Sequence, residues 1–362
     1  MMALALAEAR KGEGRTSPNP MVGAVVARND LVLAKGYHAR AGGPHAEIVA
    51  LSRAGVEARG ATLYVTLEPC NHYGRTPPCT EAILGAGIKE VVIAQKDPNP
   101  QVIGRGAEYL SGRGLKVTLG VLEDKARALN EFWLKHVTTG RPYVILKSAV
   151  TLDGKLATRT RHSRWVTGEK ARAFVHRLRD RVDAILVGRG TVEADDPALN
   201  TRRPGRRPVH NPIRIILDTH LSLPLSARVL DPAVGGPTIV ACGPRPARAK
   251  VKALTRLGAQ VWPLPRTRSG VSLTALLEKL GRAGVISLLI EGGAEVNEAA
   301  VLGEKIVDKL LFFYAPKLVG GREAPGLIGG RGAATMAEAV AVDILSLRRL
   351  GPDLLMEAVP RY

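Results

Sequence analysis

One histidine, one glutamate and two cysteines in the first quarter of the sequence have the types and spacing of a metal site. His45 and Glu47 lie in PHAEIVALSRAG (44–55), and Cys70 and Cys79 lie in EPCNHYGRTPPC (68–79). Zinc in proteins prefers four tetrahedral ligands, and a catalytic zinc leaves one of the four positions for water. His45, Cys70 and Cys79 supply one nitrogen and two sulfurs, so they predict a zinc ion with an open fourth position.

Glu47 follows His45 by two residues, within the first turn of a predicted helix, so its carboxylate can face the water on the metal. Zinc lowers the pKa of that water to about 7, and a positioned general acid–base group contributes roughly 10²–10⁴-fold in rate. We therefore expect Glu47 to be the catalytic proton shuttle, which takes a proton from the water and returns it to a leaving amine.

Other readings of these residues stay open at this point. His38 and His72 are rival nitrogen ligands, although only His45 has a glutamate two residues further on. A structural zinc site would need a fourth cysteine or histidine, and the sequence contains no C-x-x-C pair. Cys242, at the end of an apolar stretch, is expected to be an inert core thiol.

Composition limits the class of protein. The chain has 362 residues and a formal net charge of +19, which suits two domains and an anionic partner such as a phosphorylated small molecule or nucleic acid. Its three cysteines do not make a disulfide framework. No apolar run reaches the roughly 18–20 residues that cross a bilayer, and the start MMALALAEARKGEG lacks a signal-peptide layout. We expect a cytoplasmic protein.

Strands alternate with helices along the chain, which predicts an α/β fold with a largely parallel sheet. The turn-rich TTGRP (138–142) marks the expected boundary between domains 1–140 and 143–362. Before it, strands are expected at 21–28, 31–38, 61–66, 90–95 and 115–120, with helices at 2–11, 45–55, 77–87, 105–113 and 123–136. After it, strands are expected at 143–150, 183–188, 213–218, 237–242, 286–293 and 307–316, with helices at 168–180, 246–257, 271–282 and 294–302.

The second half carries glycine-containing turns after apolar strands but no G-x-G-x-x-G. These turns are VGRGTVEADDP (187–197) and IEGGAEVNEAAV (290–301). Glycine lets a backbone approach a ligand, and free N–H groups at the start of a helix attract phosphate. These turns are compatible with a phosphate-bearing ligand, and KSAVTLDGKLA (147–157) and SRWVTG (163–168) accompany them in the second half.

The zinc motif resembles the zinc-dependent deaminase superfamily and its H-x-E…P-C-x-x-C signature, except that eight residues and not two separate the cysteines. The longer spacing, with TSPNPMVGAVV (16–26) and GYHARAGGPHAE (36–47), resembles the deaminase half of the bifunctional deaminase–reductase family of riboflavin biosynthesis. The second-half segments resemble the reductase half of that family. The resemblance implies an N-terminal cytidine-deaminase-like three-layer α/β/α domain and a C-terminal dihydrofolate-reductase-like α/β domain.

The resemblance also implies the reactions and further site residues. The zinc domain would deaminate 2,5-diamino-6-(5-phosphoribosylamino)pyrimidin-4-one, and the second domain would reduce the ribosyl group to ribityl with NADPH. Asn19 would hold the pyrimidine, and HYGRTPP (72–78) would line the pocket. NADPH would face Ala149, Trp165, Thr191, Asp195, Thr219 and the loop residues Gly293, Ala294, Glu295, Val296, Asn297, Glu298 and Ala299. The ribosyl phosphate substrate would face Ser163, Arg179, Leu199, Arg202 and Glu291.

Several points depend on residue type or on resemblance alone. Arg179 and Arg202 can bind a phosphate as forked donors, and Asp195 and Glu291 are both candidates for the proton donor in the reduction. The resemblance implies a homo-oligomer, a dimer or tetramer, with no nucleic-acid or membrane partner. Two rival hypotheses are a deaminase of nucleic-acid bases, against which the wide cysteine spacing argues, and a non-catalytic metal-stabilised binding protein, against which the complete set of site residues argues.

Overall fold

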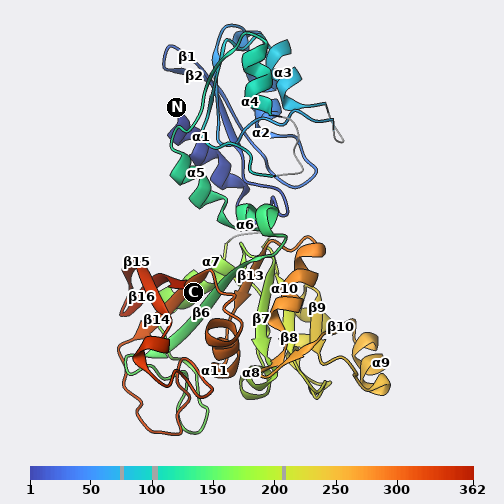
Figure 1. Cartoon of the computed structure of the whole chain (residues 1–362), viewed down its shortest axis with the longest axis vertical. Coiled ribbons are helices and arrows are strands. Elements are labelled where there is room, and N and C mark those ends of the chain that lie inside the picture. The colour runs from blue at the N-terminus through green and yellow to red at the C-terminus, as the bar shows by residue number, and fades with distance from the viewer. Residues whose placement is uncertain (74–76, 100–104, 206–208) are drawn as a thin grey trace. The chain divides into compact units, whose positions relative to one another are not determined.

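The computed structural model describes residues 1–73, 77–99, 105–205 and 209–362, and it divides into two compact units, Met1–Arg141 and Pro142–Tyr362 (Figure 1). The division falls inside TTGRP. Residues 74–76 of the segment predicted to line the deaminase pocket lie outside the described part of the chain. Among the described residues, no helix has the length and apolar character needed to cross a membrane.

The first unit is built on a five-stranded sheet with the order β2-β1-β3-β4-β5, within the described residues. β1 runs antiparallel to β2 and β3, whereas β3, β4 and β5 are parallel, so the expectation of a largely parallel sheet holds for only one side. The strands are β1 (Gly23–Arg28), β2 (Leu31–Tyr37), β3 (Thr62–Val65), β4 (Glu90–Ile93) and β5 (Lys116–Thr118), and the helices are α1 (Met2–Ala9), α2 (Ala46–Ala54), α3 (Cys79–Gly85), α4 (Gly106–Gly112), α5 (Glu123–Leu129) and α6 (Glu131–Thr139).

Helices cover both faces of this sheet. Alternate side chains of β1 point to opposite faces, as a strand requires. Ala24 and Val26 join a core with residues of α2, α3 and α4, whereas Val25 and Ala27 join another with residues of α1 and α5. This arrangement confirms the predicted three-layer α/β/α architecture.

Asn130 divides the single helix that was expected at 123–136 into α5 and α6. Its backbone leaves the helical region, with φ −107° and ψ 23°. The side chain forms two hydrogen bonds with the backbone of Met21: its Oδ1 accepts from the amide N at 2.8 Å, and its Nδ2 donates to the carbonyl at 3.0 Å. These hydrogen bonds to a residue more than a hundred positions earlier in the sequence therefore stabilise the break between α5 and α6.

The second unit contains a nine-stranded sheet with the order β10-β9-β8-β7-β13-β6-β14-β16-β15, within the described residues. The pairs from β10 to β14 are parallel, and β16 and β15 form an antiparallel hairpin at the edge that the sequence did not predict (Figure 1). The strands are β6 (Tyr143–Thr151), β7 (Ala184–Gly188), β8 (Ile213–Leu217), β9 (Thr238–Cys242), β10 (Gln260–Pro263), β13 (Ser287–Ile290), β14 (Lys309–Ala315), β15 (Ala341–Leu350) and β16 (Asp353–Arg361), besides a small hairpin of β11 (Arg266–Thr267) and β12 (Gly270–Val271).

Helices of this unit complete the core and position the loops at the strand ends. They are α7 (Glu169–Arg179), α8 (Arg189–Asp195), α9 (Arg248–Arg256), α10 (Leu273–Arg282) and α11 (Ala294–Glu298), which continues into a π-helical turn at Ala299–Gly303. Leu276, Leu277 and Leu280 of α10 pack on the central strands in the main core cluster. In sheets of parallel strands, ligands bind at the carboxyl ends of the strands. The turns after β6, β7 and β13 are therefore where a site is expected.

Candidate active sites

The three predicted zinc ligands lie together at the start of two helices. His45 is the N-cap of α2, Cys79 is the first residue of α3, and Cys70 lies in the loop after β3. His45 Nδ1 lies 3.2 Å from Cys79 Sγ and 3.6 Å from Cys70 Sγ, and the ligand atoms are all within 4.8 Å of one another. Zinc bonds of about 2.0–2.3 Å place tetrahedral ligands roughly 3.3–3.8 Å apart, so the set fits this ion.

Glu47 is buried beside these ligands, with 3% of its surface exposed. Burial raises the pKa of its carboxyl group, against the opposing effect of His45, and the side chain forms a hydrogen bond with Cys79. Hydrogen bonds from Cys79 and His45 lower the pKa of the Cys70 thiol, although burial opposes this. The thiolate is the form that binds a metal. The site thus has the donor set of a catalytic zinc, with a buried carboxyl group beside it.

His38 is not available as a metal ligand, because both of its ring nitrogens have other partners. Nδ1 lies 3.0 Å from the carbonyl oxygen of Pro44, and Nε2 lies 3.1 Å from Nδ2 of Asn19. Burial lowers the pKa of His38, whose ring meets that of His45 edge-on at 5.7 Å. His72, the other rival, is exposed. His38 therefore links Asn19 to the zinc cluster: its ring contacts both the Asn19 amide and the His45 ring. The spacing of these residues in the sequence did not reveal this link.

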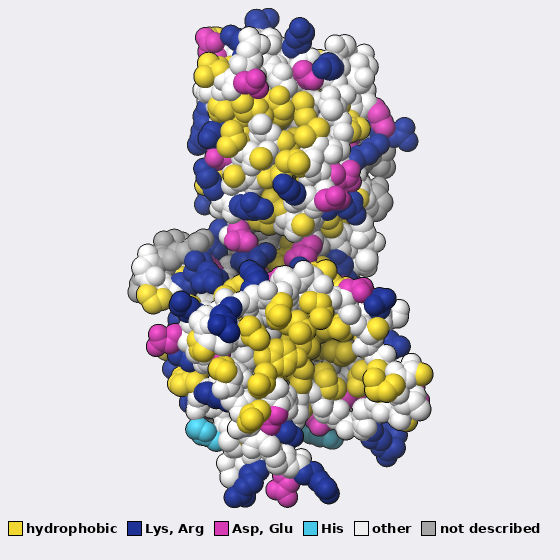
Figure 2. Space-filling view, turned by 90° about the vertical axis from the view of Figure 1, so that its left-hand side faces the viewer, with side chains coloured by type: hydrophobic (Ala, Val, Ile, Leu, Met, Phe, Trp, Pro, Cys, Tyr) yellow, Lys and Arg dark blue, Asp and Glu magenta, His cyan; other side chains and the backbone are white. Residues whose placement is uncertain are grey.

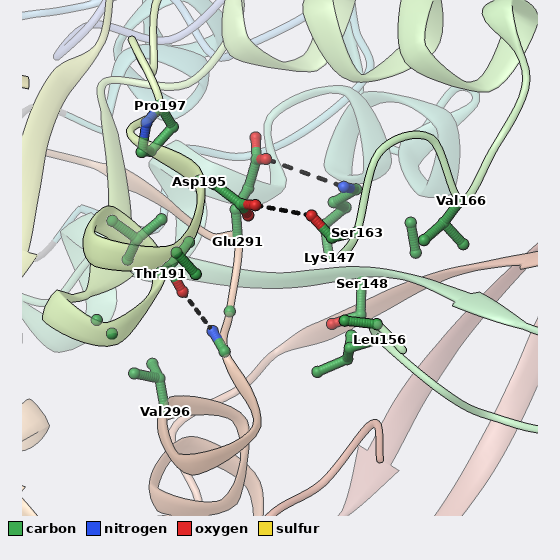
Figure 3. Close-up of a pocket in the computed structure, with 18 of the residues that line it drawn as sticks. Lys147, Ser148, Leu156, Ser163, Val166, Thr191, Asp195, Pro197, Glu291 and Val296 are labelled. Carbon is green, nitrogen blue, oxygen red and sulfur yellow. Dashed lines mark hydrogen bonds and ion pairs between the residues drawn. The ribbon is translucent and has the colours of Figure 1, made fainter. Parts of the chain in front are cut away.

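The second unit contains a cavity of about 1010 Å³ at the carboxyl ends of β6, β7 and β13 (Figure 3). Ligand pockets usually measure about 300–1,000 Å³, so this one has room for a dinucleotide and a second ligand. Most of the predicted residues line it: Ala149, Ser163, Trp165, Arg179, Thr191, Asp195, Leu199, Arg202, Glu291, Gly293, Ala294, Glu295 and Val296.

Four predicted cofactor residues are not in the lining of this cavity: Thr219, Asn297, Glu298 and Ala299. Asn297 is fully buried, and its Nδ2 donates to Ser148 Oγ at 3.1 Å and to the Leu327 carbonyl at 2.8 Å. The side chain of Asn297 thus holds the loop against β6. Thr219 follows β8, and its hydroxyl lies against Gly270 of the small hairpin. Contacts of these residues with a cofactor stay a prediction.

A buried group of three charges forms the floor of the cavity. Glu291 receives a two-point ion pair from Arg179, with Nε to Oε1 at 2.7 Å and Nη2 to Oε2 at 2.9 Å. Lys147 Nζ lies 3.9 Å from Glu291 Oε2 (Figure 3). Burial disfavours the charge on Glu291, but Arg179 and Lys147 outweigh it and lower the pKa to about 2. Glu291 is therefore a carboxylate at neutral pH, and the fork of Arg179 is already occupied by it.

Lys147 is the site residue that sequence reasoning missed. It lies in the middle of β6, within the apolar run YVILKSAV, and burial lowers the pKa of its ammonium group although Glu291 opposes the shift. A lone lysine in an otherwise buried strand is seldom left without a charged partner. That anomaly was the available signal, whereas its partner could not be read from the sequence.

Cationic and imidazole groups gather at another part of the cavity wall. The backbone N and Nε of Arg202 lie 3.1 and 3.3 Å from Nδ1 and Nε2 of His176, and a neutral imidazole accepts a hydrogen bond at one of these two nitrogens. Arg228 also lines the cavity. Burial, together with the charges of Arg179 and Arg202, lowers the pKa of His176 to about 4. With Arg179 bound to Glu291, Arg202 and Arg228 are two of the lining arginines that can meet an anion.

Asp195 and the glycine turns also line the cavity. Ser163 Oγ donates to Asp195 Oδ1 at 2.7 Å, and the backbone N of Gly293 lies 3.3 Å from Thr191 Oγ1 (Figure 3). A Cβ on Gly188 would lie 2.9 Å from Val296 Cγ2, so the turns after β7 and β13 approach too closely for a side chain there. Glycine at Gly188 and Gly293 also leaves the backbone of these cavity-lining turns open to close approach by a ligand, which suits the phosphates of a dinucleotide.

A metal-ligand cluster of deaminase type and a reductase-type sheet with a cofactor-sized cavity define a bifunctional enzyme, a zinc deaminase joined to a dinucleotide-dependent reductase. Family models match in the same order: the cytidine and deoxycytidylate deaminase zinc-binding region over residues 1–95, and the RibD C-terminal domain over residues 142–356. The chain belongs to the RibD family, the deaminase–reductases of riboflavin biosynthesis, which use zinc and NADPH.

Individual relatives are similar over their whole length. The riboflavin biosynthesis protein RibD of Aquifex aeolicus is 45% identical over 357 residues, which cover 98% of this chain and 96% of the relative. The Acinetobacter baumannii RibD structure superposes with a TM-score of 0.89 at 38% identity, covering 100% of this chain and 98% of that one. A Thermotoga maritima diaminohydroxyphosphoribosylaminopyrimidine deaminase/5-amino-6-(5-phosphoribosylamino)uracil reductase gives 0.87 at 36% identity, covering 99% and 97%. The predicted family, fold class and pair of activities are confirmed.

Proposed function

We propose that residues 1–140 carry the deaminase and residues 143–362 the reductase, each with the site residues predicted above. The observation that carries the first assignment is the meeting of His45, Cys70 and Cys79, whose ligand atoms lie within 4.8 Å of one another. The second rests on the cavity that Glu291 and the glycine turns enclose. The substrate would be 2,5-diamino-6-(5-phosphoribosylamino)pyrimidin-4-one, and the reductase would act on its deaminated product.

In the deaminase, the chain's own residues would position the ring and move one proton. Bound zinc supplies Lewis acidity, which makes water a nucleophile near neutral pH. Glu47 would accept a proton at its carboxylate and deliver it to the departing amine, because its buried carboxyl group lies beside the ligands. Asn19 would hold the pyrimidine, since it lies at the same site through His38.

In the reductase, the chain would orient the sugar phosphate, exclude water and hold a proton. NADPH supplies the hydride when it is bound. Arg202 would bind the phosphate together with Arg228, while Arg179 would hold Glu291 in position. Because Glu291 is ionised, it would accept hydrogen bonds from the sugar, and Nζ of Lys147 lies 3.9 Å from its Oε2.

We also propose that the protein is a homo-oligomer that assembles through the second unit. The edge strand β15 exposes Ile344, Leu345 and Leu347 by 58–59% each. Figure 2 shows hydrophobic side chains gathered on the face that carries the C-terminal strands. Monomeric proteins rarely leave an apolar edge strand open, because it pairs with other chains. A second copy of this chain would cover it in a dimer, or in each half of a tetramer.

The net charge of +19 is attributed to phosphorylated substrates in a cytoplasmic enzyme, without a nucleic-acid or membrane partner.

The test of the whole proposal uses one purified chain. Zinc content, ammonia release from the diaminopyrimidine and the subsequent oxidation of NADPH would be measured in sequence. Near one zinc per chain with both reactions in that order supports it; NADPH oxidation that begins without ammonia release contradicts the order. Binding of nucleic acid that weakens steeply as salt rises would instead support the rival deaminase of nucleic-acid bases.

A further inference from the structure

A short hydrogen-bond relay runs from the backbone before the zinc histidine to the residue proposed to hold the pyrimidine. The carbonyl oxygen of Pro44 lies 3.0 Å from His38 Nδ1, and His38 Nε2 lies 3.1 Å from Asn19 Nδ2. Pro44 directly precedes His45 in the chain. The relay therefore connects the metal-binding turn to Asn19 through one imidazole ring.

The chemistry of the three groups fixes the direction of the relay. A carbonyl oxygen can only accept, so His38 carries its proton on Nδ1 and donates it to Pro44. A neutral imidazole then has a bare Nε2, which accepts a hydrogen bond. The atom of Asn19 that faces His38 must therefore be the donating Nδ2, so the carbonyl oxygen Oδ1 takes the other position of the amide, and Oδ1 and the second N–H of Nδ2 are the groups that a ligand can meet.

The surroundings of His38 keep its ring in this orientation. The side chain is 3% exposed, and the backbone N donates to the Val22 carbonyl at 2.9 Å. The ring meets the His45 ring edge-on, with 86° between their planes. A Cβ on Gly12 would come within 2.6 Å of the His38 carbonyl oxygen, so the backbone on that side is closely packed as well. Rotation of the imidazole would break both hydrogen bonds.

We propose that His38 is a positioning residue of the deaminase that orients the amide of Asn19, so that the site accepts a ring presenting an N–H donor to Asn19 Oδ1. This inference rests on the proposed function, since it needs Asn19 to contact the pyrimidine. This orientation of the Asn19 amide would select between substrates. A ring that presents an acceptor atom without a proton would face the lone pairs of Asn19 Oδ1 and form no hydrogen bond with it. Leaving a buried polar group unpaired in this way rejects the wrong ligand.

The test compares Asn19→Ala, His38→Ala, His38→Gln and the double variant Asn19→Ala/His38→Ala in the full-length chain. KM and kcat for deamination of the diaminopyrimidine would be measured with zinc content. Reduction of pre-deaminated substrate by the same chain reports intact folding, and His220→Gln, an exposed histidine of the second unit, is the matched control. Loss of one substrate hydrogen bond corresponds to roughly a ten-fold change.

We expect Asn19→Ala and His38→Ala each to raise KM about ten-fold, with zinc retained and kcat nearly unchanged. The double variant should resemble Asn19→Ala alone, because His38 acts through Asn19. His38→Gln, whose side-chain oxygen can still accept a hydrogen bond from Asn19, should recover part of the loss.

An unchanged KM in His38→Ala while Asn19→Ala is impaired would overturn the role of His38 and leave the proposed function intact. Multiplied effects in the double variant, or loss of zinc in both His38 variants, would overturn it too. Absence of deamination in the wild-type chain would instead contradict the proposed function.

Discussion

Arg179 and Glu291 form a two-point ion pair on the floor of the second unit's cavity, with N–O distances of 2.7 and 2.9 Å. Only 13% and 8% of the two side chains is exposed. Lys147 lies on the other side of the same carboxylate, so a single anion balances two buried cations. Removal of one partner from such a group leaves an uncompensated buried charge, which costs more than the pair itself contributes.

Glu291→Gln is therefore expected to destabilise the second unit by about 3–5 kcal/mol and to abolish reduction. Deamination should continue, because Glu47 and the zinc ligands lie in the other unit. Denaturant unfolding and the two separate assays measure these effects. Glu193→Gln is the matched control, since it breaks an exposed pair with Arg189 that is worth about 0–1 kcal/mol. Equal stability of the Glu291→Gln and Glu193→Gln variants would contradict the buried charge group.

The stability of the second unit should depend on His176 in mildly acidic solution. Its pKa is about 4 in the folded chain, against an ordinary value of 6.5, because of burial and the charges of Arg179 and Arg202. The unfolded chain therefore takes up this proton first, and stability falls as the pH drops from about 6.5 towards 4. In the His176→Gln variant, the denaturant concentration at the unfolding midpoint should change less with pH over this range. A pH profile that the substitution leaves unchanged would contradict the assignment.

Cys79→Ser is expected to release zinc and stop deamination, because a hydroxyl is a much poorer zinc ligand than a thiolate. Reduction of pre-deaminated substrate should stay close to that of the wild type. Metal analysis and the two assays on one preparation check both statements. Cys242→Ser, at a buried cysteine of the other unit, is the control for loss of a thiol. Loss of both activities in a folded Cys79→Ser chain would mean that the boundary at 138–142 does not separate the functions.

Leu347→Asp should convert the oligomer to monomers, because it introduces a charge on the edge strand β15. Light scattering over a concentration series measures the mass. Val56→Asp, at a residue that is 89% exposed in the first unit, is the matched control and should leave the mass unchanged. A wild-type chain that is monomeric at all concentrations would refute the proposed assembly.

The zinc cluster could be predicted from the sequence because its residues obey local rules. His45 and Glu47 share one helical turn, and Cys70 and Cys79 lie at the ends of one loop, so the chemistry shows in a short stretch. Periodicity likewise located most helices and the inner strands. The order of the strands needed the structure, since antiparallel pairing of β1 with β2 and β3 leaves no clear trace in their apolar residues.

The charge group of the reductase could not be predicted, because its three members come from distant segments. Lys147 lies on β6, Arg179 ends α7, and Glu291 follows β13, so only the parallel pairing of β13 with β6 brings the lysine to the glutamate. Arg179 was expected to bind phosphate from its type and from the family resemblance, and its guanidinium group forms an ion pair with Glu291. The β15–β16 hairpin was missed because β15 is exposed along almost its whole length, so it lacks alternating burial.

The most direct test of the central claim is ammonia release by Glu47→Ala in a chain whose zinc is measured at the same time. Glu47 is the buried carboxyl group beside the ligands and not one of the three that meet at the metal site. The account predicts that this variant keeps about one zinc per chain, reduces pre-deaminated substrate normally and loses at least about 100-fold in deamination, as expected for a missing general acid–base group. Deamination at the wild-type rate with zinc retained would contradict it.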